Sequence, residues 1–184
     1  IENTGSTRQH DANITVWKDV VGDRAFALTG VTITEDGLVF DGSGASSRGV
    51  LSAEDAAATF GLAGNGTMEI VLIPDGSEGQ RVALQGPAMN SAGIAFGVTA
   101  ANWIYMQNSQ AEVGLTYNWR NTANTFSMMY AASHICLGEC VNRNGMPVPN
   151  ELYTTTMDMF GTPNACAFVG GRQRGDNGFS GKIC

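Results

Sequence analysis

Short apolar segments separated by turn residues are the feature of this sequence that most limits its fold. From Thr67 to Leu137, brief apolar and β-branched runs alternate with groups of Gly, Asn, Ser and Ala. Strands of this kind joined by tight turns are typical of a β-sandwich or barrel. The predicted strands of this region are Met68–Ile73, Val82–Gln85, Gly93–Val98, Trp103–Gln107, Glu112–Tyr117, Thr125–Tyr130 and His134–Leu137.

Two local patterns in the first sixty residues predict a hairpin and a helix. Val31–Thr34 and Leu38–Phe40 flank Glu35-Asp36-Gly37, and Asp-Gly between apolar runs is a strong hairpin signal. Ser52–Phe60 has a serine N-cap, acidic residues in its first turn and a glycine just beyond its end. We expect it to be a short surface helix.

The last third of the chain predicts further turns and a closing hairpin. Asn142–Asn150 is expected to be a turn at a sheet edge, because Asn144-Gly145 is a tight element and two prolines follow it. Leu152–Gly161 contains a β-branched run, Thr154–Thr156. Ala165–Cys184 places apolar residues before a glycine pair, then a polar turn, then a second short strand, so we predict an antiparallel hairpin there.

The composition agrees with an all-β chain of one domain. Hydrophobic residues make up 43% and charged residues 15% of the 184 residues, with 24 Gly against 5 Pro. This balance suits short strands and tight turns better than long charged helices. We find no internal repeat and no linker, and the length suits one sandwich. We therefore expect residues 1–184 to form a single domain, with Ile1–Asn13 as a polar N-terminal arm or loop.

Charge and hydropathy argue against two classes of partner. The formal net charge is −7, and the 10 Lys and Arg residues form no cluster, so the chain would repel phosphate backbones. No apolar run approaches the roughly 20 residues that a membrane helix needs. We expect neither a nucleic-acid partner nor a membrane span.

Four cysteines lie in the last third, and their even number favours two disulfides in a protein that works outside the cytosol. The pairing stays open. In an extended segment Cys136 and Cys140 would lie about 13 Å apart, too far to bridge unless the residues between them turn. Pairing with Cys166 and Cys184 is the alternative.

Four segments, in order, resemble one family. Ile14–Asp19 is similar to a T-x-W-x-D entry, and Leu38–Ser43 to an L-x-F-D-G-S motif. Gly66–Pro74 is similar to a strand that usually reads F-T-I-E-x-W-V-K-P, and Phe168–Ile183 to a closing F-I-G-G…F-x-G-K-I motif. Together they resemble the laminin-G-like group of concanavalin A-like lectin and glucanase domains. The resemblance implies a jelly-roll sandwich of two antiparallel sheets.

The sequence departs from the family pattern in two places. Leu137–Asn142 carries extra residues and two cysteines where the family has L-Y-V-N-G, and the usual V-R-I-Y-N-R ending does not follow Cys184. Two interpretations follow: the chain is a fragment lacking its last strand, or a neighbouring chain completes the sheet edge.

Catalytic patterns are missing from the sequence. The resemblance would imply paired carboxylates on one strand in a glucanase, but Glu69 and Glu112 each stand without such a partner. His10 and His134 lie beside no nucleophile motif. We expect no enzymatic activity and no catalytic residues, and a glycoside hydrolase is the less favoured hypothesis.

Acidic turn residues are candidates for a metal site. Calcium binds at the sandwich rim in the resembled family, and carboxylates and carbonyls in turns are suitable ligands. Asp also suits turns for reasons of backbone conformation alone. The candidate calcium ligands are Asp36, Asp41 and Asp176, with Asp75 in a similar turn.

Aromatic residues are candidates for a sugar-stacking platform, since aromatic faces suit the apolar face of a pyranose. Trp17 belongs to this set as a general candidate, and core packing is the alternative role for all of them. The predicted ligand-binding residues are Trp103, Tyr105, Tyr117 and Trp119, of which Trp119, in a predicted loop, is the best exposed candidate.

A tripeptide that integrins bind, Arg174-Gly175-Asp176, lies in the predicted closing turn. Chance explains such a tripeptide easily, and Gly-Asp-Asn-Gly is ordinary turn chemistry. We carry it as a candidate adhesion site.

These observations lead to one favoured hypothesis and two others. The favoured one is an extracellular, non-catalytic module at the cell surface that binds a glycan or a partner protein. The second is a structural subunit of a surface assembly or filament that self-associates by strand addition. The third is the glycoside hydrolase described above.

Overall fold

The structure is a computed structural model, and the part that it describes is a set of ranges along the chain. These are residues 15–19, 23–35, 37–60, 66–75, 81–86, 95–98, 103–107, 112–116, 124–131, 134–136, 141–143, 146–147, 154–156 and 165–184. Side chains are described in 15–19, 23–35, 37–60, 69–75, 82–86 and 165–184.

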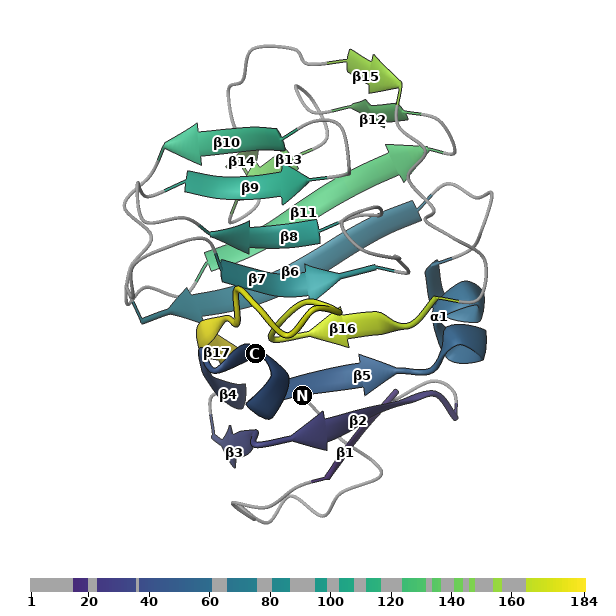
Figure 1. The fold of residues 1–184 in the computed structure, drawn as a ribbon. Helices are drawn as coiled ribbons and strands as arrows, with labels where there is room; N and C mark the ends of the chain where they lie inside the picture. The colour runs from purple at the N-terminus through teal and green to yellow at the C-terminus, as the bar shows by residue number, and fades with distance from the viewer. Residues whose placement is uncertain are drawn as a thin grey trace.

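The described strands form two antiparallel sheets, which Figure 1 shows as two layers, one behind the other. One sheet has eight strands in the order β1-β2-β5-β16-β7-β8-β9-β10. They are β1 (Val16–Lys18), β2 (Ala25–Thr29), β5 (Arg48–Leu51), β16 (Ala167–Val169), β7 (Arg81–Gln85), β8 (Ala95–Val98), β9 (Trp103–Gln107) and β10 (Glu112–Thr116).

The other sheet has nine strands, and its main path runs β14-β13-β11-β6-β17-β4-β3, with β12 between β11 and β15. They are β3 (Thr32–Thr34), β4 (Gly37–Asp41), β6 (Gly66–Pro74), β11 (Asn124–Ala131), β12 (His134–Cys136), β13 (Val141–Arg143), β14 (Met146–Pro147), β15 (Thr154–Thr156) and β17 (Ser180–Ile183). The predicted all-β sandwich of two antiparallel sheets is confirmed.

The predicted hairpin around Glu35–Gly37 and the predicted tight turn within Asn142–Asn150 are both present. In the first, Thr34 pairs with Gly37, and the Thr34 hydroxyl donates a hydrogen bond of 3.1 Å to the Gly37 carbonyl. In the second, Arg143 pairs with Met146 across Asn144-Gly145, and β14 lies at the end of the described sheet, as the prolines predict.

The predicted helix is α1 (Ala53–Phe60), and it is the one α-helix in the described part of the chain. The Ser52 hydroxyl accepts a hydrogen bond of 3.1 Å from the Asp55 N–H, so Ser52 is the N-cap. One face of the helix is buried, because Ala56 and Phe60 pack with Leu51 of β5. Nothing in the described residues forms a helix long and apolar enough to cross a membrane.

The core lies between the sheets and follows the two-residue period of the strands. In β4, Leu38 and Phe40 are buried, whereas Val39 between them is only half-buried. Ile183 of β17 pairs with Leu38 and with Leu72 of β6, and these three side chains form one buried row. The rows from both sheets fill the space between the layers.

The prediction of a closing hairpin at Ala165–Cys184 is wrong. β16 lies between β5 and β7 in one sheet, and β17 lies between β4 and β6 in the other. The segment between them therefore crosses from sheet to sheet. Glycine and polar turn residues allow either connection, and burial decides between them: β16 is wholly buried and Phe179 is 0% exposed between the layers.

The crossing segment is anchored on β7. Gly170 donates a backbone hydrogen bond to Ala83 and accepts one from Phe179, and Val82 donates one to Asn177. Gly170 has φ of 77°, a left-handed conformation that favours glycine. Because β17 pairs on both sides, a strand from another chain has no open side of β17 to join.

Candidate functional site

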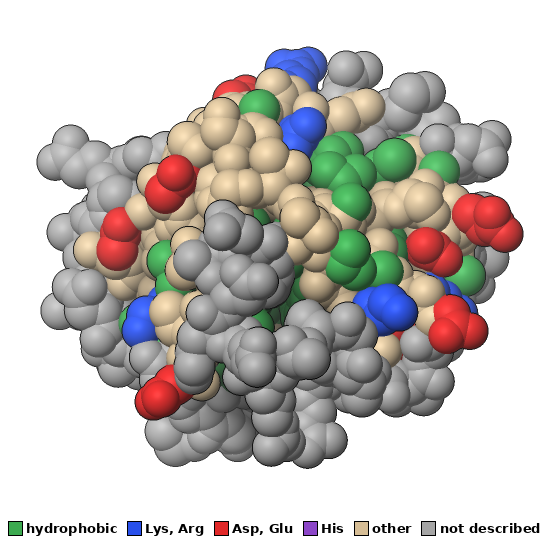
Figure 2. All heavy atoms as spheres, turned by 90° about the horizontal axis from the view of Figure 1, so that it is seen from below, with side chains coloured by type: hydrophobic (Ala, Val, Ile, Leu, Met, Phe, Trp, Pro, Cys, Tyr) green, Lys and Arg blue, Asp and Glu red, His purple; other side chains and the backbone are tan. Residues whose placement is uncertain are grey.

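A half-open pocket lies where β1, β2, β5 and α1 meet. Its volume is about 290 Å³. The residues that line it are Trp17, Lys18, Asp19, Arg24, Phe26, Leu51 and Thr59. Figure 2, which views the molecule from the side of β1 and β2, shows hydrophobic side chains open to solvent beside basic and acidic ones.

The register of the sheet builds the apolar wall of the pocket. Trp17 pairs with Phe26 across β1 and β2, and Phe26 pairs with Leu51 across β2 and β5. Residues directly opposite each other in antiparallel strands project from the same face. The row therefore starts with the half-buried Trp17 near the sheet edge and ends at Leu51, which is 1% exposed.

Trp17 and Phe26 form an aromatic pair. Their ring centroids lie 5.5 Å apart, with an angle of 27° between the planes, so the rings are stacked. Such pairs contribute about 0.5–1.5 kcal/mol beyond their burial. Both rings remain half-buried, so part of their apolar surface borders the pocket.

The same two strands bring charged side chains to the pocket. Asp19 and Arg24 each lie two residues from a member of the aromatic pair, and the Asp19 N–H donates a hydrogen bond of 2.8 Å to the Arg24 carbonyl. The antiparallel pairing therefore continues past β1, and the two-residue period places both on the face of Trp17 and Phe26. Lys18 lines the pocket as well.

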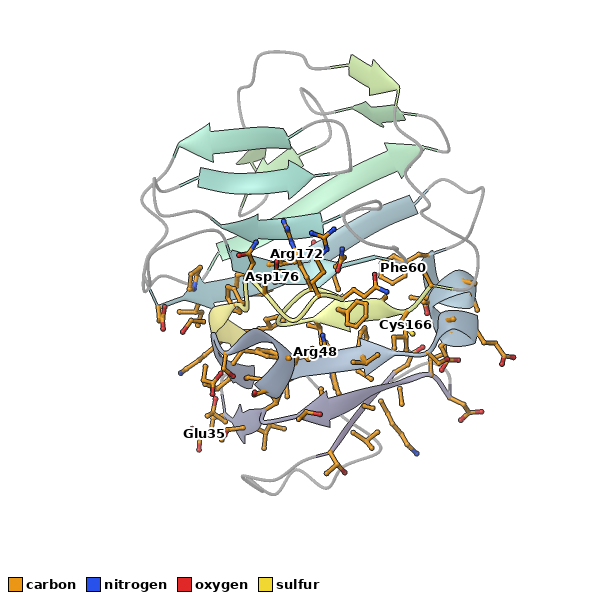
Figure 3. The ribbon with its side chains drawn as sticks, viewed as in Figure 1. Glu35, Arg48, Phe60, Cys166, Arg172 and Asp176 are labelled. Carbon is orange, nitrogen blue, oxygen red and sulfur yellow. The ribbon has the colours of Figure 1, made fainter. Side chains whose placement is uncertain are left out.

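Helix α1 supplies the remaining wall through Thr59. The helix is held by its buried face, where Phe60 and Ala56 pack with Leu51 and Ala167. Figure 3 shows Phe60, the last residue of α1, on the same side of the molecule as Cys166, which precedes β16. Leu51 belongs both to this core cluster and to the lining, so the wall of the pocket is fixed to the core.

This arrangement suits a small ligand with an apolar face and polar edges. Ligand sites are concave and mostly apolar, with a few polar groups that orient the ligand. Here the aromatic pair and Leu51 provide the apolar surface, and Arg24, Lys18 and Asp19 provide charged hydrogen-bonding groups. The lining residues include no nucleophile paired with a general base.

The predicted aromatic platform falls largely outside the described side chains. Trp103 and Tyr105 lie two residues apart on β9, where Trp103 pairs with Thr116 and Tyr105 with Gly114. Tyr117 and Trp119 lie outside the described residues. Those four residues stay a prediction, whereas Trp17, a general candidate in the sequence, lies in the pocket.

Sequence reasoning missed Phe26 and Arg24. A signal was present, because Gly22-Asp23 is a turn-forming pair, and Trp17 and Phe26 each stand four residues from Val21-Gly22, on either side of it. A hairpin centred there would have placed the two aromatic rings opposite each other. The sequence analysis predicts no strand at Ala25–Thr29, so the sequence alone does not indicate this pairing.

The calcium site stays a prediction: the described part of the chain contains no group of three or more His, Cys, Asp or Glu side chains that could hold a metal ion, and one predicted ligand lies outside it. Asp41 instead accepts a 2.8 Å hydrogen bond from the Ser43 N–H. Hydrogen bonds from the Ser43 side chain and backbone lower the pKa of the Asp41 carboxyl. Asp75 accepts a hydrogen bond from the Ser180 hydroxyl, and Asp36 lies outside the described residues.

The cysteines do not decide the disulfide prediction. Cys166 precedes β16 and Cys184 follows β17, so they belong to different sheets; both are half-buried thiols and are not bonded to each other. Cys136 ends β12, its side chain is not described, and Cys140 lies outside the described residues. Disulfides that involve Cys136 and Cys140 stay a prediction.

The tripeptide Arg174-Gly175-Asp176 lies in the crossing segment rather than in a hairpin turn. Arg174 and Asp176 are exposed. Gly175 donates a hydrogen bond of 3.0 Å to Arg172 and accepts one of 3.1 Å from Ala45. The tripeptide is therefore presented on a fixed turn, and its adhesion role stays a prediction.

A second set of contacts holds this turn from β5 and β7. The Arg48 guanidinium donates hydrogen bonds to the carbonyls of Arg172, at 2.7 Å, and Gln173, at 3.2 Å. It also lies over the Phe168 ring, 5.2 Å from the centroid. The Gln85 side chain, 2% exposed, accepts a hydrogen bond from the Gln173 N–H. Figure 3 shows Arg48 below Arg172 and Asp176.

Comparisons with known proteins give a fold and no sequence family. No protein-family model matches the chain, and no curated protein matches its sequence. The specific assignment to the laminin-G-like group thus stays a resemblance.

Solved structures similar to this chain include a sialidase and binding domains of neurotoxins. Trypanosoma rangeli sialidase in complex with sialic acid matches with a TM-score of 0.69 and 17% identity, over 95% of this chain and 28% of that chain. The binding domain of botulinum neurotoxin DC in complex with rat synaptotagmin II matches with a TM-score of 0.60 and 11% identity, over 88% of this chain and 42% of that chain.

A further match is botulinum neurotoxin type C, whose cell entry depends on interaction with two ganglioside molecules. Its TM-score is 0.60 at 9% identity, over 95% of this chain and 42% of that chain. The chain therefore spans less than half the length of these structures. Lectin-like β-sandwich architecture is what they share with it.

Proposed function

We propose that this chain is a non-catalytic recognition module that binds a glycan, outside the cell and at the cell surface. The observation that carries the proposal is the pocket formed by the Trp17–Phe26 stack, Leu51 and the charged side chains beside them. Its volume of about 290 Å³ suits one sugar ring. The apolar face of a pyranose packs well on an aromatic ring, and charged groups can orient its polar edges.

The similar structures support the proposal at the level of the fold. One is a complex with sialic acid, and another concerns a toxin whose cell entry depends on gangliosides, so sandwiches of this shape occur in proteins that meet glycans. Another similar structure is a complex with a protein, rat synaptotagmin II, so a partner protein is the other class of ligand among them. Fold alone does not imply function, so our choice of a glycan rests on the pocket.

A glycan array on the folded protein tests the proposal. We expect selective binding, and we expect Trp17→Ala to weaken it at least about tenfold, or about 1.4 kcal/mol. Trp17→Phe keeps an aromatic ring and should retain part of the affinity. Val16→Ala is the matched control, because Val16 is exposed, neighbours Trp17 on β1 and does not line the pocket.

Three results would decide against this account. A blank array on folded protein would refute glycan binding. Equal affinity of the Trp17→Ala and Val16→Ala variants would refute the pocket as the binding site. Loss of binding in Trp119→Ala alone would place the ligand at the aromatic set that the sequence predicted.

The surface-assembly hypothesis has a separate test. Strand addition needs an open sheet edge, and β17 is paired on both sides, so the edge would have to be an outer strand such as β1 or β3. Light scattering after size exclusion measures the result directly. A monomer at micromolar concentration would contradict the assembly.

A further inference from the structure

Arg24 places a guanidinium beside the aromatic stack, and no carboxylate in the described part of the chain pairs with it. Arg24 is half-buried and lines the pocket. Its backbone carbonyl accepts a hydrogen bond from the Asp19 N–H, but its side chain makes no ion pair with any residue that the structure describes. Charged groups beside apolar surface are normally paired, because removing them from water costs free energy.

The other charged groups of the pocket do not cancel this one. Lys18 and Asp19 also line the pocket, and each has an interaction of its own. Two cations and one carboxylate give the lining a formal charge of +1, whereas the whole chain carries −7. Asp23 precedes Arg24 in the chain, but it is exposed and is not part of the lining. The pocket is thus locally cationic in an acidic protein.

We infer that the ligand of this pocket is an acidic sugar, whose carboxylate pairs with Arg24 while its ring packs against Trp17. The inference rests on the proposed function and adds the class of sugar. A guanidinium presents its N–H donors in a planar fork that matches the two oxygens of a carboxylate, so the pair is directional as well as charged. A neutral sugar would offer that donor group only uncharged hydroxyl oxygens, and hydrogen bonds between charged partners are the stronger ones.

A uronic acid and a sialic acid share this chemistry, so the experiment uses both. Isothermal titration compares methyl α-D-glucuronide with methyl α-D-glucoside, and the methyl glycoside of N-acetylneuraminic acid with its methyl ester. In each pair the two sugars differ in the carboxylate. We expect one acidic sugar to bind at least about tenfold more tightly than its neutral partner, and we expect added salt to reduce the difference.

Arg24→Gln should remove the preference, bringing the acidic sugar to the affinity of the neutral one. Arg174→Gln is the matched control, because Arg174 is exposed in the crossing segment and does not line the pocket. Thermal unfolding of each variant shows that the fold is retained.

The outcomes separate this inference from the proposal beneath it. Equal binding of acidic and neutral sugars, unchanged by Arg24→Gln, would overturn the acidic-sugar inference and leave the glycan module in place. A preference that survives Arg24→Gln would also overturn it. No binding of any sugar, on the titration or the array, would overturn both.

Discussion

Replacing Gly170 with alanine adds a methyl group at the point where the chain leaves β16 and crosses to the other sheet. The new Cβ would lie 2.0 Å from Cδ1 and 2.2 Å from Cε1 of Phe40. Ordinary carbon contacts are about 3.5–4.0 Å, so the ring would have to move. Phe40 is 1% exposed and packs edge to face on Phe179, at 6.4 Å between centroids, which leaves it little room.

The cost has two parts. The φ of 77° is left-handed, and an L-residue there costs about 1–2 kcal/mol more than glycine. Overpacking of a closed core costs about 1–3 kcal/mol. We therefore expect Gly170→Ala to lower the free energy of unfolding by about 2–5 kcal/mol, the sum of the two.

Urea denaturation followed by circular dichroism measures this cost. The midpoint should fall by about 1–2 M, since a chain of this length is expected near the upper end of the usual slopes of about 1–3 kcal/mol per M. Gly171→Ala is the control: its Cβ would meet nothing closer than 3.6 Å, and its φ is not positive. An equal cost for the two variants would refute the described crossing between the sheets.

Two further changes test local features of the fold. Ser52→Ala removes the acceptor of the Asp55 N–H and should cost about 1 kcal/mol in urea denaturation, and an unchanged midpoint would refute the cap. Ser43→Ala should raise the pKa of Asp41 toward its ordinary value of 3.8, because that carboxylate loses a hydrogen-bond donor, as a carboxyl carbon-13 titration would show. Because the pKa of Asp41 is lowered in the folded state, its carboxylate stabilises the fold above pH 3.8, and this contribution is lost as the pH falls through the lowered pKa. Equal pKa values of Asp41 in wild type and variant would contradict the role of the Ser43 side chain.

Local signals predicted the elements that local chemistry determines. The Glu35–Gly37 and Asn144-Gly145 turns, the Ser52 cap and the strands of the middle region follow from residues next to each other in the chain. The connection within Ala165–Cys184 could not be predicted in this way, because Gly170 and the polar residues after it suit a hairpin and an inter-sheet crossing equally. The difference lies in tertiary contacts such as the hydrogen bond from Gly170 to Ala83.

The pocket was less predictable than the fold for the same reason. Trp17 is visible in the sequence as an aromatic candidate, but its value as a ligand surface depends on Phe26 across the β1–β2 pair and on Leu51 beyond it. That row requires the register of β1, β2 and β5, none of which was predicted as a strand from the sequence. Arg24 becomes a candidate only after the register places it on the same face.

The central claim is that a glycan binds in the pocket of Trp17 and Phe26. Nuclear magnetic resonance during titration with the best-binding sugar from the array tests it most directly, through the indole N–H signals of Trp17, Trp103 and Trp119. The account predicts a saturable shift of Trp17, together with the backbone signals of Arg24, while Trp103 and Trp119 stay unchanged. Saturable shifts of Trp103 or Trp119 with Trp17 unmoved would contradict it.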